Sequence, residues 1–201
     1  MADRLHFDMD RALDGFLRIF WMNGYRATTT RDLAKSAAIS ESSLFNSFTS
    51  KRAVYIKTLR RYREKSRFML ENMENAESAL DGIRNYWQAL GKIVADPKLT
   101  RGCMITNASI EQADELEILA FLQEVHRAYD RDFQKTLDRA RAQGELKPDT
   151  DTKALAQYLA HSAQGLRVLA KINPGKKKVK NIVELTLSTL DQFRTDSKQS
   201  Q

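Results

Sequence analysis

The chain has 201 residues, of which 42% are hydrophobic and 29% charged, enough for one large domain or two small ones. A single cysteine, Cys103, excludes an internal disulfide framework, and no stretch approaches the ~18 consecutive apolar residues of a membrane span, so we expect a cytoplasmic protein. Residues 1–67 carry 14 Lys and Arg against 7 Asp and Glu, whereas residues 68–201 carry 19 of each, which predicts either an anionic partner for the first third or a solvated basic surface.

The first predicted helix runs from residue 8 to residue 23, because apolar residues recur there with the period of one helix face. Asp8 is a suitable N-cap for it. Gly24 follows the last helical residue and is free to take the positive φ that ends a helix. We therefore expect an amphipathic helix that ends at a tight turn.

Two short helices are predicted next. Thr29 begins the first, and Asp32 stands three residues later at the spacing of a capping box. The chain turns at Ala38-Ile39, and Ser40 caps the second helix. Helices shorter than ~12 residues are marginal in water, so both must pack on neighbouring helices. Two short helices joined by a tight turn form a helix-turn-helix.

The second short helix carries short polar side chains on the face that packing leaves free. Such a face can enter a major groove and hydrogen-bond base edges directly or through water. Lys51 begins the following helix, where its ammonium and the helix N-terminal amides can face a phosphate. The spacing therefore predicts a compact wedge for DNA. The residues of the free face are Glu41, Ser42, Ser43, Asn46 and Ser47.

The rest of the chain is predicted to be helical throughout, which makes the fold class all-α. A long helix is expected from residue 51 to about residue 74, and the boundary between the basic and neutral parts falls inside it. No period-2 strand pattern, internal repeat or low-complexity linker occurs. Five further helices are expected at about 77–95, 102–113, 114–142, 151–172 and 177–193.

The stretch GYRATTTRDLAKSAAISESSLFNSFTSK, residues 24–51, resembles the DNA-binding signature of the tetracycline-repressor (TetR) family without a gap. RGCMITNASIEQA, residues 101–113, and AQGELKPDTDTKALAQYLAHSAQGLRVLAKIN, residues 142–173, are similar to a large subgroup of that family with an R-G-C-x-x-x-N opening. The resemblance implies an all-α homodimer. Its expected parts are a three-helix helix-turn-helix domain at 1–50, a connecting helix at 51–75, an effector-binding and dimerising helical bundle at 76–195, and a frayed tail at 196–201.

The resemblance also implies a DNA-binding transcriptional regulator. We expect a repressor that leaves a palindromic double-stranded operator when an unknown small-molecule effector binds. Ala38 departs from the family pattern, in which the turn often has Gly, and Phe45 replaces a Tyr that would contact a phosphate. Glu41 either accepts from a cytosine amino group or supports the helix N-terminus. By position in the signature, the expected DNA contacts are Thr30, Arg31, Glu41, Ser42, Ser43, Phe45, Asn46, Ser47 and Lys51.

The effector or sensing site is expected in the second domain. Cys103 stands near a helix start, two residues after Arg101, and both features favour a thiolate, so a thiol-based sensor of electrophiles or oxidants is an alternative function. The opposing interpretation is a small residue packed at a helix start. Aromatic residues between helices can line a cavity. The candidates are Cys103, Tyr86, Trp87, Phe121 and Lys171.

The last two long helices are expected to form the dimer's four-helix interface. No H-E-x-x-H, phosphate loop or nucleophile elbow occurs, and three histidines with one cysteine are too few for a metal site or a triad. We therefore expect no enzyme, no metal and no cofactor. A sequence-nonspecific DNA-binding protein is the remaining alternative. The expected dimer seam consists of Leu155, Leu159, Leu166, Leu169, Leu185, Leu187 and Leu190.

Overall fold

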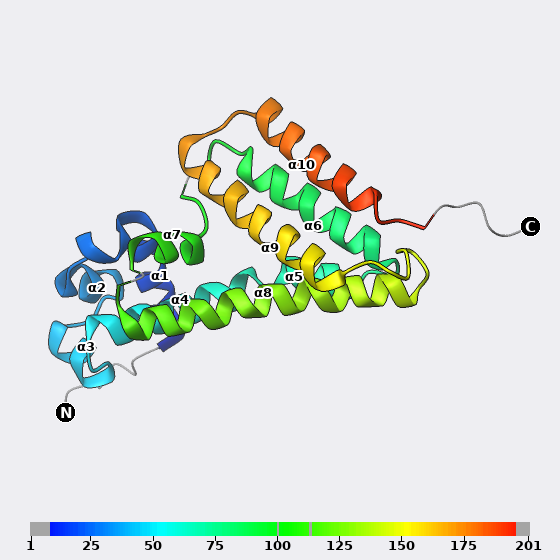
Figure 1. The fold of residues 1–201 in the computed structure, drawn as a ribbon. Coiled ribbons are helices and arrows are strands. Elements are labelled where there is room, and N and C mark those ends of the chain that lie inside the picture. Colours follow the sequence, from blue (N-terminus) through cyan, green and yellow to red (C-terminus); the bar gives the residue numbers. More distant parts are fainter. Residues whose placement is uncertain (1–8, 100, 113, 196–201) are drawn as a thin grey trace, which may run out of the picture. The chain divides into compact units, whose positions relative to one another are not determined.

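The computed structural model describes residues 9–99, 101–112 and 114–195, which form helices with short connections (Figure 1). Within these ranges no strand occurs, apart from an antiparallel bridge between Leu146 and Arg194. The predicted all-α class is therefore confirmed. The predicted N-cap Asp8 and the predicted frayed tail at 196–201 lie outside the described residues.

Contacts divide the chain into two compact units, and the described residues of unit 1 are 9–66, 107–112 and 114–122. α1 packs against both α2 and α4, and α2 packs against α3. The helices that lie wholly in this unit are α1 (Met9–Ala27), α2 (Thr30–Ser36), α3 (Glu41–Ser47) and α4 (Lys51–Ser66).

The core of unit 1 explains why its short helices are stable. Phe16 of α1 is fully buried, and its ring meets that of Phe48 edge-on, with centroids 5.7 Å apart. A Cβ atom at Gly15 would lie 2.5 Å from the backbone oxygen of Ser36, so α1 and α2 approach more closely than any side chain there allows. Gly24 takes φ 77° inside α1 and kinks it where the sequence predicts the first helix to end.

The described residues of unit 2 are 67–99, 101–106 and 123–195. α6 packs against α5, α9 and α10, and its Trp87 side chain is fully buried. The unit boundary falls inside α7 (Met104–Glu111) and α8 (Leu116–Ala142). The helices wholly in unit 2 are α5 (Phe68–Glu74), α6 (Ala79–Val94), α9 (Thr152–Leu169), the 3-10 helix η1 (Ala170–Ile172) and α10 (Lys176–Asp191).

The single helix predicted over 51–74 is instead two helices, α4 and α5, separated at Arg67. The Ser66 hydroxyl donates to the Arg63 carbonyl at 3.2 Å, and such side-chain bonds compete with the helical ladder. The Arg67 guanidinium also forms ion pairs with Glu74 at 3.2 Å and Asp132 at 3.4 Å. The sequence pattern could not predict this break, because Asp132 is distant in the chain.

The predicted domain boundaries at 50/51, 75/76 and 195/196 stay predictions. Residues 107–122, which the sequence suggested for the second domain, pack in unit 1. In the described part of the chain, no helix combines the length and the apolar character needed to cross a membrane.

Candidate nucleic-acid interface and effector site

The predicted helix-turn-helix consists of α2 and α3, and both begin at their predicted caps. Thr29 Oγ1 accepts from the Asp32 amide at 3.1 Å, while the Asp32 carboxylate accepts from the Thr29 amide at 2.9 Å. Hydrogen bonds from Thr29 hold the pKa of Asp32 below its ordinary value. Ser40 Oγ accepts from the Ser43 amide at 3.1 Å. An aspartate can therefore complete the capping box in place of the usual glutamate.

Ala38 makes the turn between α2 and α3 in a conformation that glycine adopts more easily. Its φ is 55°, in the left-handed region. The turn is closed by two backbone bonds: Ala38 donates to the Lys35 carbonyl at 3.2 Å, and Ile39 donates to the Ala34 carbonyl at 3.0 Å. The alanine therefore holds a strained position that the packing of α2 and α3 maintains.

α3 has one buried and one exposed face, as the sequence predicts. Leu44 is 1% exposed and Phe48, its C-cap, is 3% exposed. Phe45 on the opposite side is 49% exposed. The outer face is thus polar except for one aromatic ring. Its exposed residues are Glu41, Ser42, Phe45 and Asn46, and its half-buried residues are Ser43 and Ser47.

Glu41 joins the two helices of the motif. It is the first residue of α3, and its carboxylate accepts from the Thr30 hydroxyl of α2 at 2.8 Å. Arg31 Nε lies 3.8 Å from the same carboxylate, although the Arg31 side chain is 88% exposed. In the unbound protein Glu41 therefore connects α3 to α2, and its support of the start of α3 stays a prediction. A contact with cytosine stays a prediction.

Lys51 is held in place at the start of α4. Its ammonium lies 4.5 Å from the centroid of the Tyr25 ring, a cation–π contact. Partial burial lowers the pKa of Lys51 below its ordinary value. Tyr25 was not among the predicted site residues. Its position after Gly24 in the family signature could have identified it as a site residue. The contact restricts where the ammonium can lie.

Three of the predicted effector residues are buried in unit 2. Cys103, Tyr86 and Trp87 are 6%, 2% and 0% exposed. Tyr86 Oη accepts from Arg167 Nη2 at 2.7 Å, and Cys103 acts electrostatically on the same guanidinium. Arg167 was missed from the sequence. The sequence feature that could have identified it is its position within the apolar run GLRVLA of a predicted helix, where a charged residue is unusual.

The two other candidates lie elsewhere. Phe121 belongs to unit 1, where its ring centroid is 5.1 Å from the guanidinium carbon of Arg60. Lys171 is exposed on the 3-10 helix η1. Neither is placed beside Cys103 by any of these contacts, so their roles in an effector site stay predictions.

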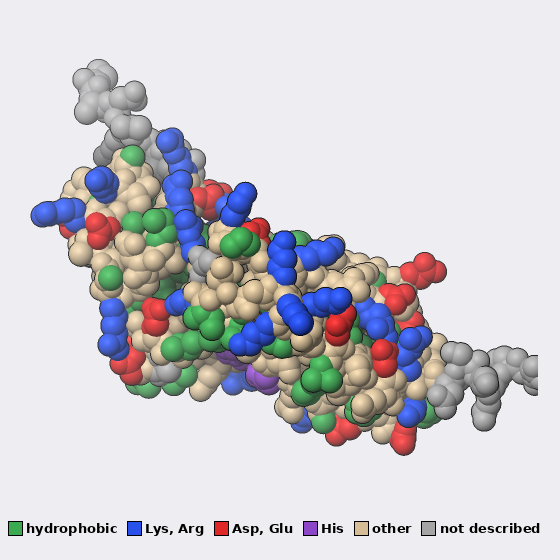
Figure 2. Space-filling model, turned by 90° about the horizontal axis from the view of Figure 1, so that it is seen from above, with side chains coloured by type: hydrophobic (Ala, Val, Ile, Leu, Met, Phe, Trp, Pro, Cys, Tyr) green, Lys and Arg blue, Asp and Glu red, His purple; other side chains and the backbone are tan. Residues whose placement is uncertain are grey.

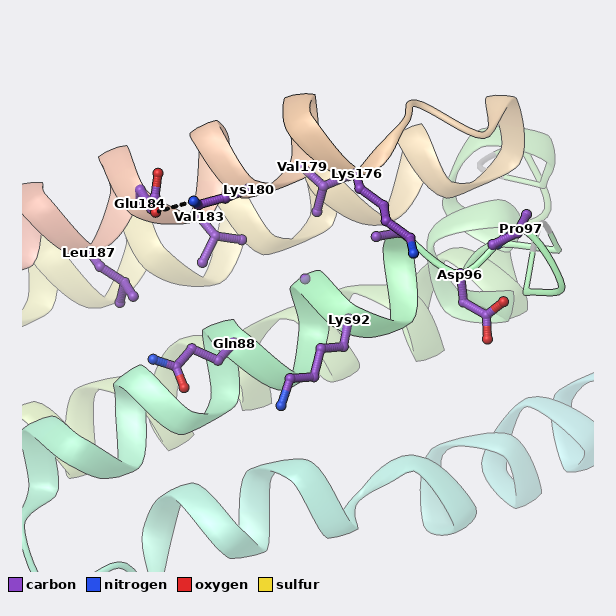
Figure 3. A pocket seen from close by; sticks show the side chains of 12 residues that line it. Gln88, Lys92, Asp96, Pro97, Lys176, Val179, Lys180, Val183, Glu184 and Leu187 are labelled. Atoms are coloured by element: carbon purple, nitrogen blue, oxygen red, sulfur yellow. Dashed lines mark ion pairs between the residues drawn. The ribbon is translucent and has the colours of Figure 1, made fainter.

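A groove of about 600 Å³ runs between α6 and α10 of unit 2 (Figure 3). Val183 and Leu187 point from α10 toward α6 in it, and Lys92 stands on the α6 side. Lys180 and Glu184 form an ion pair of 3.6 Å at its edge. None of the five predicted effector residues lines this groove. It is therefore separate from the group around Arg167.

The predicted dimer seam is wrong for most of its leucines. Because α9 and α10 pack against α6, their richest apolar sides face inward. Leu169 is half-buried and Leu185 is 69% exposed. Tyr158 and Ile172 of the α9–η1 segment are also outward, at 43% and 68% exposure. The seam leucines that are buried within one chain are Leu155, Leu159, Leu166, Leu187 and Leu190.

Lys and Arg side chains are spread over the face drawn in Figure 2, with Asp and Glu among them. The charges on this face therefore do not by themselves locate a nucleic-acid interface, and the position of that interface stays a prediction from the helix-turn-helix. Among the described residues, no group of three or more His, Cys, Asp or Glu side chains could hold a metal ion.

Comparison with known proteins identifies related sequences over most of the chain. Residues 12–57 match the family described as "Bacterial regulatory proteins, tetR family", and residues 79–184 match "Tetracyclin repressor-like, C-terminal domain". The chain is 30% identical to the uncharacterized HTH-type transcriptional regulator YezE of Bacillus subtilis (strain 168), over 95% of this chain and 100% of that one. It is 29% identical to the HTH-type transcriptional repressor ComR of Escherichia coli (strain K12), over 90% and 88%.

Among solved structures, a cysteine mutant of the TetR family transcriptional regulator CifR complexed with 26-bp double-strand operator DNA is similar, with a TM-score of 0.83. It is 26% identical to this chain, and the match covers 92% of this chain and 98% of that one.

Proposed function

This chain belongs to the tetR family of bacterial transcriptional regulators, which are DNA-binding proteins and not enzymes, and we propose that it is a repressor released from a palindromic operator by a small-molecule effector. The names of its relatives support this proposal: ComR is named a repressor, and the CifR structure contains operator DNA. We also assign the chain to the subgroup with the R-G-C-x-x-x-N opening, on the residues at 101–107. A cytoplasmic location stays part of the proposal.

The observation that carries the proposal is the two-faced α3. Its apolar residues Leu44 and Phe48 hold it against the core of unit 1, while short polar side chains face outward. A helix of this kind can approach base edges closely at the positions where its outward side chains are short, such as Ser42 and Asn46. Lys51 and the amides at the start of α4 are suited to the adjacent phosphate.

Two copies are needed for such a short recognition helix to reach the ~10⁻⁸ to 10⁻¹¹ M affinities of specific regulators. The outward residues of α9, η1 and α10, including Tyr158, Ile172 and Leu185, are the surface that we assign to the homodimer. A two-fold dimer requires a palindromic operator with half-sites about one helical turn apart or somewhat more.

A footprint on the DNA around the protein's own gene tests the proposal. We expect one protected palindromic segment, with binding that weakens as salt rises because phosphate contacts release counterions. A packaging protein, the sequence-nonspecific alternative, would protect no segment in particular. Uniform protection of all fragments would therefore contradict the proposed regulator.

A thiol-based sensor is the second candidate function, favoured by the electrostatic influence of Cys103, which raises the pKa of Arg167. Burial of Cys103 to 6% exposure opposes it, because reactive thiols are usually partly exposed. We expect a non-covalent effector to be the signal. If a thiol-reactive electrophile releases wild type from the operator but not Cys103→Ser, the thiol is the switch instead.

A further inference from the structure

Arg167 is a half-buried cation for which the described part of the chain supplies no paired carboxylate. Its Nη2 donates to Tyr86 Oη at 2.7 Å, and its guanidinium carbon lies 5.9 Å and 5.6 Å from the ring centroids of Tyr86 and Tyr129. Its Nη1 is out of contact with solvent and has no hydrogen-bond partner among the described residues. No carboxylate within the described part of the chain forms an ion pair with it.

This arrangement is unfavourable for the protein by itself. An arginine cannot lose its proton, so a buried guanidinium needs a partner to offset its lost hydration. Burial lowers the pKa of Arg167, but Tyr86, Cys103 and Tyr129 together raise it above its ordinary value, so the charge persists. Phenols and thiols are mostly neutral near pH 7, and aromatic faces offset a cation only in part.

The polar groups near Arg167 have hydrogen-bond donors left over. Gln164, one turn earlier on α9, accepts from the Thr106 hydroxyl at 2.7 Å, and its Nε2 is buried without a partner among the described residues. Residues three apart on a helix lie on neighbouring parts of one face. Arg167 Nη1 and Gln164 Nε2 are two hydrogen-bond donors without a partner among the described residues. They suit a ligand group that only accepts hydrogen bonds. The planar guanidinium favours two oxygens in one plane.

We infer that the effector is a small organic carboxylate, whose carboxylate group pairs with Arg167 while its body lies against the rings of Tyr86 and Tyr129. This inference rests on the proposed function, since it names the chemistry of the effector that unit 2 binds. Arg167 as a residue retains partial exposure. The carboxylate provides the charge that Arg167 lacks in the unliganded protein.

The first test measures thermal unfolding of wild type, Arg167→Met and the matched control Lys153→Met, which changes an exposed cation on the same helix. The probes are sodium benzoate and sodium phenylacetate at millimolar concentrations, each compared with the corresponding amide and with an equal concentration of sodium chloride. We expect the carboxylates, and not the amides, to raise the midpoint for wild type and Lys153→Met but not for Arg167→Met. No carboxylate effect on wild type would overturn the inference.

The unliganded variants give a second, independent result. Because the methionine removes an unpaired buried charge and keeps a long side chain, Arg167→Met should unfold at or above the wild-type temperature. A large fall would mean that Arg167 is a satisfied structural residue, which contradicts the inference. Thiolate absorbance near 240 nm at pH 7, present in wild type and absent from Cys103→Ser, would make Cys103 the missing anion and would also overturn it.

Operator binding by unliganded wild type separates this inference from the proposed function. A protein that binds no specific DNA contradicts the regulator itself, whatever the carboxylates do. Specific binding that benzoate and phenylacetate leave unchanged, together with no thermal shift, contradicts the carboxylate inference alone. Release by a carboxylate and not by its amide supports both.

Discussion

Arg31 and Glu41 show how single residues order the surface that we propose faces DNA. In the unbound protein the Glu41 carboxylate accepts a hydrogen bond from Thr30 and lies near Arg31. These contacts restrict the positions of the three side chains. The ion pair with Arg31 is long and solvent-exposed, and such pairs contribute little to stability. Arg31 can therefore leave Glu41 for a base or a phosphate at small cost.

Arg31→Ala tests whether this side chain contacts a base. We expect operator affinity to fall by ~1–3 kcal/mol and specificity to relax at one base pair in each half-site. The measurement is fluorescence anisotropy with the operator and with single-base variants of it. Equal losses on all sequences would instead make Arg31 a phosphate contact.

Lys51→Ala tests the phosphate contact at the start of α4. Binding should weaken alike on operator and unrelated DNA, and the slope of log K against log salt should become shallower by about 1 for each phosphate that Lys51 neutralises in the wild type. Lys153→Ala, an exposed lysine of α9, is the control and should keep the wild-type slope. A Lys51→Ala protein with an unchanged slope would remove this residue from the interface.

At the scale of elements, the turn between α2 and α3 is a strained part of unit 1. A left-handed alanine destabilises the folded state by ~1–2 kcal/mol, and Ala38→Gly removes that strain. The glycine also stabilises the unfolded state by ~0.4–1 kcal/mol, because it gives the unfolded chain more conformational freedom. We therefore expect net stabilisation of about 0.5–1 kcal/mol, because the strain exceeds the entropy. Urea unfolding at fixed protein concentration measures it, and a destabilised Ala38→Gly would show that the turn is not strained.

Gly15→Ala should have the opposite effect on the same pair of helices. The new methyl would meet the backbone oxygen of Ser36, which cannot rotate away as a side chain can, so α1 and α2 must separate. Overpacking of this kind typically costs ~1–3 kcal/mol. The same urea measurement should show the loss, and a Gly15→Ala protein as stable as wild type would contradict the close approach.

The elements that sequence predicted well are those with local causes. The caps at Thr29 and Ser40 depend on residues within one turn, and the structure has both. At Gly24 the structure has a kink inside α1, which continues to Ala27, where the sequence predicts the helix to end. The break at Arg67 and the inward sides of α9 and α10 depend on distant partners, which periodicity does not contain. Arg167 was missed for the same reason: its significance is the absence of an anionic partner among the described residues around it in three dimensions.

At the scale of the molecule, unit 1 contains more than the helix-turn-helix. Arg52, next to Lys51 on α4, forms ion pairs with Glu115 at 3.4 Å and Glu117 at 3.0 Å. Both acids belong to the 107–122 segment, which also includes the beginning of α8. The helix that presents Lys51 is thus attached to a segment far along the chain, within one compact unit.

The dimer surface is the last point to test, and Leu185 is its most exposed leucine on α10. Leucine burial contributes ~1.5–3 kcal/mol per side chain, and a two-fold interface counts it twice. Leu185→Glu would place a carboxylate at this buried position of the dimer, at a further cost of several kcal/mol for each unpaired charge.

We expect Leu185→Glu to be monomeric by light scattering at micromolar concentration. We also expect its operator affinity to fall toward the nonspecific level, because only one half-site is bound at a time. Leu99→Glu changes an exposed leucine outside α9 and α10 and should remain dimeric. A dimeric Leu185→Glu with wild-type operator affinity would show that the two copies meet through another surface.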